Sequence, residues 1–155
     1  MPMRIRPLPP ARPERSCLLA LCVPALDGLT PDLLQQVDHT LAQCDAASLR
    51  DDVQIVLAEA INNIVEHAYA GPGFGAVALR VTLTKSSLCI HLTDWGHPFP
   101  ENANPDGQVP DPQDRSEGGY GWFLIRALAS RTRYTRKAGR NRLCLLFRIP
   151  GTHPG

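Results

Sequence analysis

The sequence predicts an α+β fold, a two-layer α/β sandwich in which three helices cover one face of a mostly antiparallel sheet. The first observation is the order of segments: strand, helix, helix, strand, strand, long loop, helix, strand, strand. The second is that the last four strand-like segments form two adjacent pairs, as antiparallel hairpins do. The third is the length of 155 residues, which suits one domain with a full-sized core better than two small ones.

The first half of the chain is expected to hold one strand and two helices. Apolar side chains predominate at residues 17–23, which predicts the strand. Residues 30–44 have a helix signature, with Thr30 as the N-cap and Pro31 at the first helical position. A second helix is expected from about residue 48 to 69, where a glycine-rich segment ends it.

The second half is expected to hold two hairpins separated by a loop and a helix. Strand-like runs at 76–84 and 87–94 predict the first hairpin, and residues 131–150 predict the second, with a turn around 138–141. Between them, residues 96–121 carry five prolines and almost no periodicity, and a helix follows them to residue 131. A loop of this length inside a compact domain is usually functional or disordered.

The ends of the chain differ in composition from the middle. Residues 1–15 are rich in proline and arginine, so we expect a flexible arm before a domain at 16–150 and a short tail at 151–155. The arm lacks the apolar core of a signal peptide. The longest apolar stretch, residues 17–26, is interrupted by Pro24 and is too short to span a bilayer. We therefore expect a cytoplasmic protein without a membrane partner.

The five cysteines are an odd number and include no CxxC pair. All but Cys44 lie within apolar runs. We therefore expect buried, reduced thiols in preference to a zinc site or a disulfide.

Charge is unevenly distributed along a chain that is nearly neutral overall. Residues 27–66 hold eight acidic side chains and one basic side chain, whereas residues 126–148 hold eight basic side chains and no acidic one. A basic stretch can bind nucleic acid or surround phosphate. No aromatic or helical readout motif accompanies this one, so direct nucleic-acid binding is not expected.

The stretch EAINNIVEHAY places three polar side chains at steps of four in the second predicted helix. Glu59, Asn63 and His67 would lie in one row on the flank of its apolar face, partly desolvated but able to reach a cleft. From this row alone, a ligand-facing wall and a solvated edge with accidental spacing remain equally open. The apolar face itself comprises Val53, Leu57, Ala60, Ile61, Ile64, Val65 and Ala68.

Two further motifs lie at the ends of other predicted elements. In TDWGHPF, Asp94 ends a strand and can accept a hydrogen bond from a ligand amine, while Gly96 allows a flat ring to approach the backbone. In EGGYGWFLI, three glycines precede an apolar helix, whose free N–H groups can bind an anion. No Walker lysine follows these glycines, which excludes a P-loop.

Taken in order, E-x-x-x-N-x-x-x-H, D-x-G-x-P-F and G-G-x-G-x-x-L-I resemble the nucleotide-binding boxes of the GHKL ATPase superfamily. The short single-domain form, with the tyrosine of EHAY and the proline-phenylalanine of DWGHPF, is most similar to the anti-sigma-factor serine kinases of the RsbW type. The resemblance covers roughly residues 17–149. It implies a Bergerat-type ATP-binding fold.

The resemblance assigns roles to the polar row of the helix. Its glutamate is the general base in the family, which implies that Glu59 takes the proton from an incoming serine hydroxyl. The asparagine four residues later binds magnesium beside ATP, which implies that Asn63 is the metal ligand. His67 matches a polar or basic position near the phosphates.

The other two motifs would hold the rest of ATP. Asp94 matches the aspartate that binds the adenine amino group, and Gly96 and Pro98 line the same pocket. Residues 97–117 correspond to the lid over ATP, in which Arg115 is placed to reach phosphate. The glycines beneath the triphosphate would be Gly118, Gly119 and Gly121.

The chain departs from the family pattern in two places. Relatives often have a Gly-Thr pair near the adenine in the last hairpin, where this chain has Asn141 and Arg142. Trp122 replaces a small aliphatic residue after the last glycine. Both are expected to be ordinary packing variation.

The resemblance implies an anti-sigma regulatory factor with ATP- and Mg²⁺-dependent serine protein kinase activity. Its partners would be an anti-anti-sigma protein with a STAS domain, phosphorylated on serine, and a sigma factor or similar regulator. A homodimer is also implied.

Three alternatives remain beside this kinase. The first is an ATP-binding interaction module that sequesters a regulator without transferring phosphate. A detached histidine-kinase catalytic domain is disfavoured, because no helical dimerisation segment precedes residue 17. A metal enzyme using Glu59 and His67 is disfavoured because residues eight apart lie about 12 Å apart along a helix.

Overall fold

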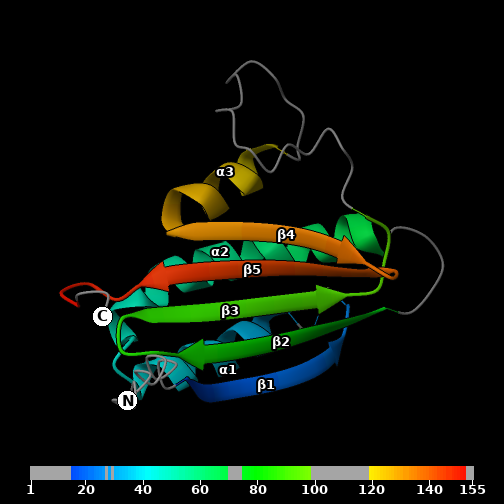
Figure 1. Ribbon diagram of the computed structural model, residues 1–155. Coiled ribbons are helices and arrows are strands. Elements are labelled where there is room, and N and C mark those ends of the chain that lie inside the picture. The colour runs from blue at the N-terminus through cyan, green and yellow to red at the C-terminus, as the bar shows by residue number, and fades with distance from the viewer. Residues whose placement is uncertain (1–14, 27, 29, 70–74, 99–118, 153–155) are drawn as a thin grey trace, which may run out of the picture.

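Five antiparallel strands form one sheet in the order β1-β2-β3-β5-β4 (Figure 1). The computed structural model describes residues 15–26, 28, 30–69, 75–98 and 119–152. The strands are β1 (Ser16–Pro24), β2 (Ala76–Leu83), β3 (Ser87–Asp94), β4 (Arg131–Lys137) and β5 (Arg140–Arg148). The helices are α1 (Thr30–Ala42), the short 3₁₀ helix η2 (Ala47–Leu49), α2 (Arg50–Asn63), the π-helix η3 (Ile64–Ala68) and α3 (Gly119–Leu128). The predicted α+β fold is confirmed.

The helices α1 and α2 pack on one face of the sheet, behind it in Figure 1, and α3 packs against α2 next to the edge strand β4. Side chains alternate along the strands, so Leu88, Ile90 and Leu92 of β3 are buried in the core while Cys89 and His91 between them are only partly buried. The opposite face, here called the open face, is covered by none of the helices that the structure describes.

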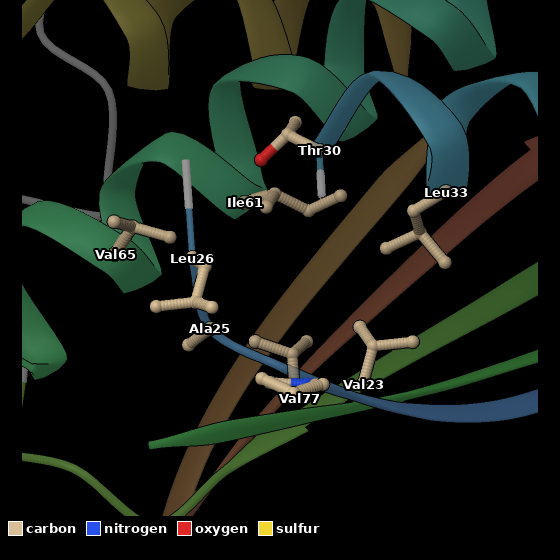
Figure 2. Close-up of a pocket in the computed structure, with 9 residues that line it drawn as sticks. Val23, Ala25, Leu26, Thr30, Leu33, Ile61, Val65 and Val77 are labelled. Atoms are coloured by element: carbon tan, nitrogen blue, oxygen red, sulfur yellow. The ribbon is translucent and has the colours of Figure 1, made fainter. Parts of the chain in front are cut away.

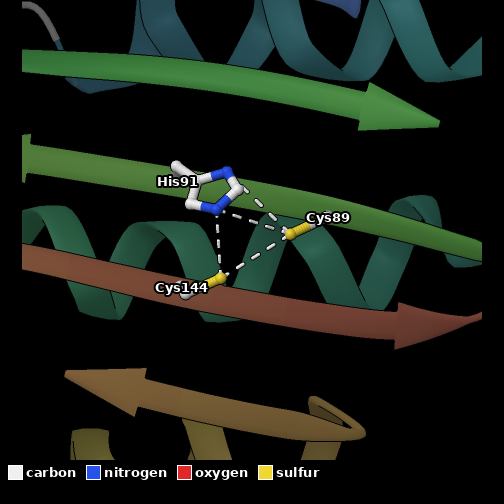
Figure 3. A group of neighbouring side chains, drawn as sticks. All are labelled: Cys89, His91 and Cys144. Carbon is white, nitrogen blue, oxygen red and sulfur yellow. Dashed lines mark hydrogen bonds between the residues drawn. The ribbon is translucent and has the colours of Figure 1, made fainter. Parts of the chain in front are cut away.

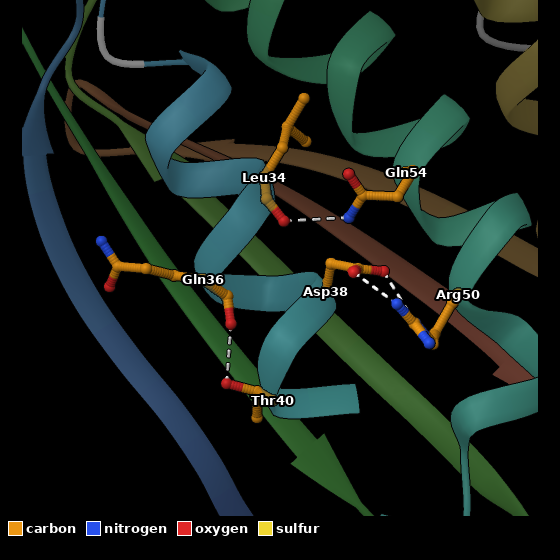
Figure 4. A network of polar contacts seen from close by, with 6 residues as sticks. All are labelled: Leu34, Gln36, Asp38, Thr40, Arg50 and Gln54. Atoms are coloured by element: carbon orange, nitrogen blue, oxygen red, sulfur yellow. Dashed lines mark hydrogen bonds and ion pairs between the residues drawn. The ribbon is translucent and has the colours of Figure 1, made fainter. Parts of the chain in front are cut away.

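A polar network joins α1 to α2 (Figure 4). Asp38 accepts two hydrogen bonds from the guanidinium of Arg50, at 2.8 Å and 2.6 Å. Gln54 donates a hydrogen bond of 3.0 Å to the backbone carbonyl of Leu34. Because the ion pair is partly exposed to solvent, it contributes little to stability, and apolar packing between the helices and the sheet supplies most of it.

The second predicted helix is present, but the prediction of one regular α-helix is wrong. It begins with the 3₁₀ turn η2, continues as α2 and ends as the π-helix η3, so the steps of four from Glu59 to His67 do not follow one continuous α-helix. A π turn adds a residue to each hydrogen-bonded ring and rotates the side chains that follow it. Hydrophobic spacing alone does not reveal such a change of pitch.

The third predicted helix is displaced from its expected position, whereas the final turn lies within the predicted range of 138–141. The helix α3 begins at Gly119, so Gly119 and Gly121 lie within its first turn rather than before it. The final hairpin turns at Ala138 and Gly139, with φ angles of 51° and 74°, and Asn141 belongs to β5. Two consecutive positive φ angles are typical of the type I′ turn that matches the twist of a hairpin.

The prediction that the cysteines are buried is wrong. Cys17 and Cys22 are exposed, and Cys44, Cys89 and Cys144 are partly buried. The apolar runs that contain most of them are strands, and every second residue of a strand faces away from the core.

None of the helices in the described part of the chain has the length and apolar character of a membrane span.

Candidate functional site

The candidate site begins where α2 meets the first turn of α3. Glu59 is partly buried, and its carboxylate points at Gly121 so closely that a Cβ placed there would lie 2.5 Å from Oε2. The first N–H groups of a helix lack intrahelical partners and carry partial positive charge. A carboxylate beside them is electrostatically favourable, and the absence of a side chain at Gly121 makes the approach possible.

Asn63 lies one turn further along α2 and is only 7% exposed. Its Nδ2 atom is buried and has no hydrogen-bond partner among the described residues. A half-turn of the amide would present its oxygen to the same space, because the two ends of an amide are similar in size. Leaving such a group unsatisfied costs about 1–3 kcal/mol. The chain thus holds a polar group that a bound ligand or hydrated cation could satisfy.

The second wall of the site is the end of β3. Asp94 is 3% exposed, and its Oδ1 accepts hydrogen bonds from the Gly96 backbone N–H at 3.0 Å and from Nδ2 of Asn141 at 2.7 Å. These bonds hold the carboxylate in one orientation. A fixed acceptor of this kind can recognise the amino group of a flat ring.

The two walls are tied together through Gly96 and η3. A Cβ on Gly96 would collide with the carbonyl of Ala68, and the His97 backbone N–H donates a hydrogen bond of 2.7 Å to that same carbonyl. The last carbonyls of a helix need partners from outside it. The loop after β3 supplies one, which joins the segment that follows Asp94 to the end of the helix that carries the polar row.

Tyr69 provides a second tie at the end of η3. Its hydroxyl donates a hydrogen bond of 2.6 Å to the carbonyl of Ala76 and accepts one of 2.9 Å from the backbone N–H of Trp95. Its ring also lies over Gly75, where no Cβ could fit. The tyrosine of EHAY therefore connects the helix to both strands of the central hairpin.

Asn141 is a site residue that the sequence analysis missed. It is 1% exposed, and besides Asp94 its Nδ2 donates to the carbonyls of Gly96 and His97 at 3.3 Å and 3.0 Å. Its Oδ1 accepts hydrogen bonds from the Tyr134 hydroxyl at 2.8 Å and from Arg136 at 2.6 Å. The departure from Gly-Thr is therefore more than packing variation, because Asn141 holds the Asp94 loop in place.

The remaining expected residues are placed as follows. His67 lies in η3 and is partly buried, and Pro98 is exposed at the end of the described loop. Gly119 begins α3. Trp122 is 5% exposed and belongs to the hydrophobic core, as expected for packing variation. Arg115, Gly118 and residues 99–117 of the expected lid lie outside the described residues.

A separate apolar pocket lies between β1, α1 and the end of α2 (Figure 2). Its lining is mostly apolar and includes Val23, Leu26, Leu33, Ile61 and Val65. Thr30 adds one hydroxyl group to this lining. No charged side chain lines it among the described residues. It therefore lacks the groups that a triphosphate would need, and the site between α2, α3 and β3 remains the candidate.

Comparison with known proteins identifies the same kind of domain. Residues 26–147 match the family described as the histidine kinase-like ATPase domain. The chain is 36% identical over 95 residues to the serine-protein kinase RsbW of Halalkalibacterium halodurans, covering 57% of each chain.

Two further relatives are covered more completely. The serine/threonine-protein kinase BtrW of Bordetella bronchiseptica is 30% identical over 116 residues, which are 74% of this chain and 82% of the relative. The serine-protein kinase RsbW of Bacillus licheniformis is 30% identical over 135 residues, which are 84% of this chain and 76% of the relative.

A solved structure supports the fold. The RsbU and RsbW domains of a Mycobacterium tuberculosis protein superpose with a TM-score of 0.58 at 20% identity, over 84% of this chain and 32% of that one. At this identity the likeness concerns architecture alone.

Proposed function

The chain belongs to the histidine kinase-like ATPase family as a relative of the RsbW-type serine-protein kinases, and we propose that it transfers the γ-phosphate of ATP to a serine of a partner protein. The partner would be an anti-anti-sigma protein with a STAS domain, and a sigma factor or similar regulator would be the second client. The protein would act as a homodimer and require Mg²⁺.

The observation that carries the proposal is the approach of Glu59 to the first turn of α3, next to the unsatisfied amide of Asn63. Phosphoryl transfer requires a base near the attacking hydroxyl, and it requires neutralisation of the charge on phosphate. A helix N-terminus contributes to the second requirement. Glu59 is close enough to that N-terminus to serve the first.

In this proposal, one end of the site binds adenine, and the other binds the phosphates and carries out the transfer. At one end, Asp94 would accept a hydrogen bond from the adenine amino group, and Gly96 and Pro98 would line the adenine pocket. At the other end, Glu59 would take the proton from the serine hydroxyl. Asn63 would supply an amide oxygen to Mg²⁺, which when bound neutralises phosphate charge. His67, Gly119 and Gly121 would contact the phosphates, and Arg115 and Gly118, which lie outside the described residues, would join them.

Phosphotransfer from γ-labelled ATP to purified STAS-domain candidates tests the kinase directly. Wild type should label a serine, and Glu59→Gln should lower the rate by at least 100-fold, consistent with loss of a general base. Glu66→Gln is the matched control, because Glu66 is exposed on the same helical segment. Equal labelling by wild type and Glu59→Gln would contradict the role of the base.

The close contact between Glu59 and α3 also favours a second candidate, an ATP-binding interaction module without phosphoryl transfer. A carboxylate beside a helix N-terminus stabilises that helix whether or not it acts as a base. Under this alternative, ATP would raise the melting temperature of wild type and no serine would be labelled. Absence of any ATP-dependent stabilisation would count against both functions.

A further inference from the structure

Three side chains with metal-binding donors converge on the open face, away from the candidate ATP site. Cys89 and His91 project from β3, and Cys144 projects from β5 (Figure 3). In the strand register His91 is paired with Cys144, and Cys89 lies two residues from His91 on the same face. Neighbouring and diagonal positions on one sheet face are close enough for side chains to meet.

The distances among the three donors match a metal coordination shell. The two sulfurs are 3.6 Å apart, and Nε2 of His91 lies 3.2 Å from the sulfur of Cys144 and 3.8 Å from that of Cys89. In a tetrahedral zinc site, Zn–S bonds of about 2.3 Å and Zn–N bonds of about 2.0 Å place neighbouring ligand atoms roughly 3.5–3.8 Å apart. Shifts of a few tenths of an ångström would complete this geometry.

We propose that Cys89, His91 and Cys144 bind one Zn²⁺ ion, with water as the fourth ligand. Thiolate and imidazole donors are the set that zinc prefers. The three side chains are partly buried, and His91 lines a hollow of the open face, so an ion can reach them from solvent. Because no acidic or amide oxygen belongs to the cluster, hard cations such as Mg²⁺ would compete poorly.

The charges around the cluster suit a neutral centre. The Cys144 sulfur lies within 3.6 Å of the Cys89 sulfur and 3.2 Å of Nε2 of His91, so the three donors face one point. Zn²⁺ would bind Cys89 and Cys144 as thiolates and release their protons to solvent, and the two thiolates would balance the charge of the ion. The arginines paired with this row, Arg80 and Arg133, would then face no net positive charge.

A disulfide between Cys89 and Cys144 is the competing chemistry. Its formation would require the sulfurs to move from 3.6 Å to about 2.05 Å and would leave His91 without a role. Zinc uses all three donors with little movement. The structure therefore favours a metal over a covalent bond at this position.

Cobalt and zinc titration of the full, reduced, metal-free chain without nucleotide tests the proposal. We expect one equivalent of Co²⁺ to produce the sulfur-to-metal charge-transfer absorption and visible bands of a tetrahedral thiolate site, and Zn²⁺ to displace it. Cys89→Ser, Cys144→Ser and His91→Ala should each weaken zinc binding by at least 100-fold, as measured by competition with a chromophoric chelator.

Cys22→Ser and Asn63→Ala are matched controls and should bind zinc like wild type. Cys22 is an exposed cysteine of the neighbouring sheet region outside the cluster, and Asn63 lies in the candidate ATP site. Urea unfolding of the metal-free variants checks that each remains folded. The proposal would be overturned if no thiolate–cobalt band appeared, or if Cys22→Ser weakened zinc binding as much as the cluster variants. It would also be overturned if Cys89 and Cys144 formed a disulfide and the reduced chain bound no zinc.

Discussion

Asn141 donates a hydrogen bond of 2.7 Å to Asp94 across neighbouring strands, and both side chains are almost fully buried. The two residues are paired in the register of β3 and β5. Because the same amide also binds the carbonyls of Gly96 and His97, one side chain on β5 determines the shape of the loop that ends β3.

Replacement of Asn141 by alanine should therefore disturb both stability and nucleotide binding. We expect Asn141→Ala to lower the free energy of unfolding by about 2–3 kcal/mol, since it leaves several buried polar groups without partners. ATP affinity should fall at least tenfold. Urea denaturation and nucleotide titration measure the two effects. The exposed Asn62→Ala should change stability by less than about 0.5 kcal/mol; a similar loss in both variants would contradict the role of Asn141.

Gly96→Ala should destabilise the protein because the added methyl group would collide with the carbonyl of Ala68. Overpacking against backbone costs about 1–3 kcal/mol. The matched substitution is Gly28→Ala, where no atom lies within 4 Å of the new Cβ. Thermal unfolding of both variants tests this difference. If Gly96→Ala had the same melting temperature as wild type, the contact between the loop and η3 would not be tight.

Asn63→Ala should affect the nucleotide-bound protein much more than the free protein. Replacing the Asn63 amide removes the free-energy cost of a buried polar group without a hydrogen-bond partner. The free protein should therefore lose little stability despite the smaller side chain. The stabilisation provided by ATP with Mg²⁺ should fall markedly. Melting temperatures with and without Mg²⁺–ATP measure both quantities. A loss in the free protein as large as that of Asn141→Ala would instead show a structural role.

The ion pair between Asp38 and Arg50 should make stability depend on acid pH. The hydrogen bond from Arg50 lowers the pKa of Asp38 below its ordinary value of 3.8. The folded state therefore binds this proton more weakly than the unfolded state, and the contribution is fully present above pH 3.8 and is lost as the pH falls through the lowered pKa.

Comparison of wild type with Asp38→Asn by urea unfolding between pH 7 and pH 2 tests this dependence. The difference between the two proteins should be small, constant at neutral pH and reduced by salt, because both side chains are solvent-accessible. It should shrink below pH 3.8. Asp45→Asn, at an exposed position without a described ion pair, should show no such change.

The sequence predicted the architecture because its strands and helices have strong periodicity. The alternation of Leu88, Ile90 and Leu92 with polar residues identifies the core face of β3, and the long-range fold follows from such patterns. The same alternation contained the signal for Cys89 and His91 on the open face. The prediction that the cysteines are buried considered only the apolar residues around them and did not use this alternation.

Other features depend on contacts between distant segments. The role of Asn141 follows only once β5 is placed beside β3, which local propensity does not determine. The end of the π-helix is likewise bound to the loop after β3, through the hydrogen bond from His97 to the Ala68 carbonyl. Both features combine residues that are far apart in the chain, and one sequence shows no signal of their proximity.

The order of the strands also bears on how copies of the chain can associate. Among the strands that the structure describes, the edge strands are β1 and β4, whose outer backbone groups could pair with another sheet. The edge strand β1 carries a bulge between Cys17 and Leu19 and ends at Pro24, while β4 carries Arg131, Arg133, Arg136 and Lys137. An irregular backbone and repelling like charges both oppose edge-to-edge pairing. Extension of the sheet from one molecule to the next, the usual start of fibrous aggregation, is therefore discouraged at both ends.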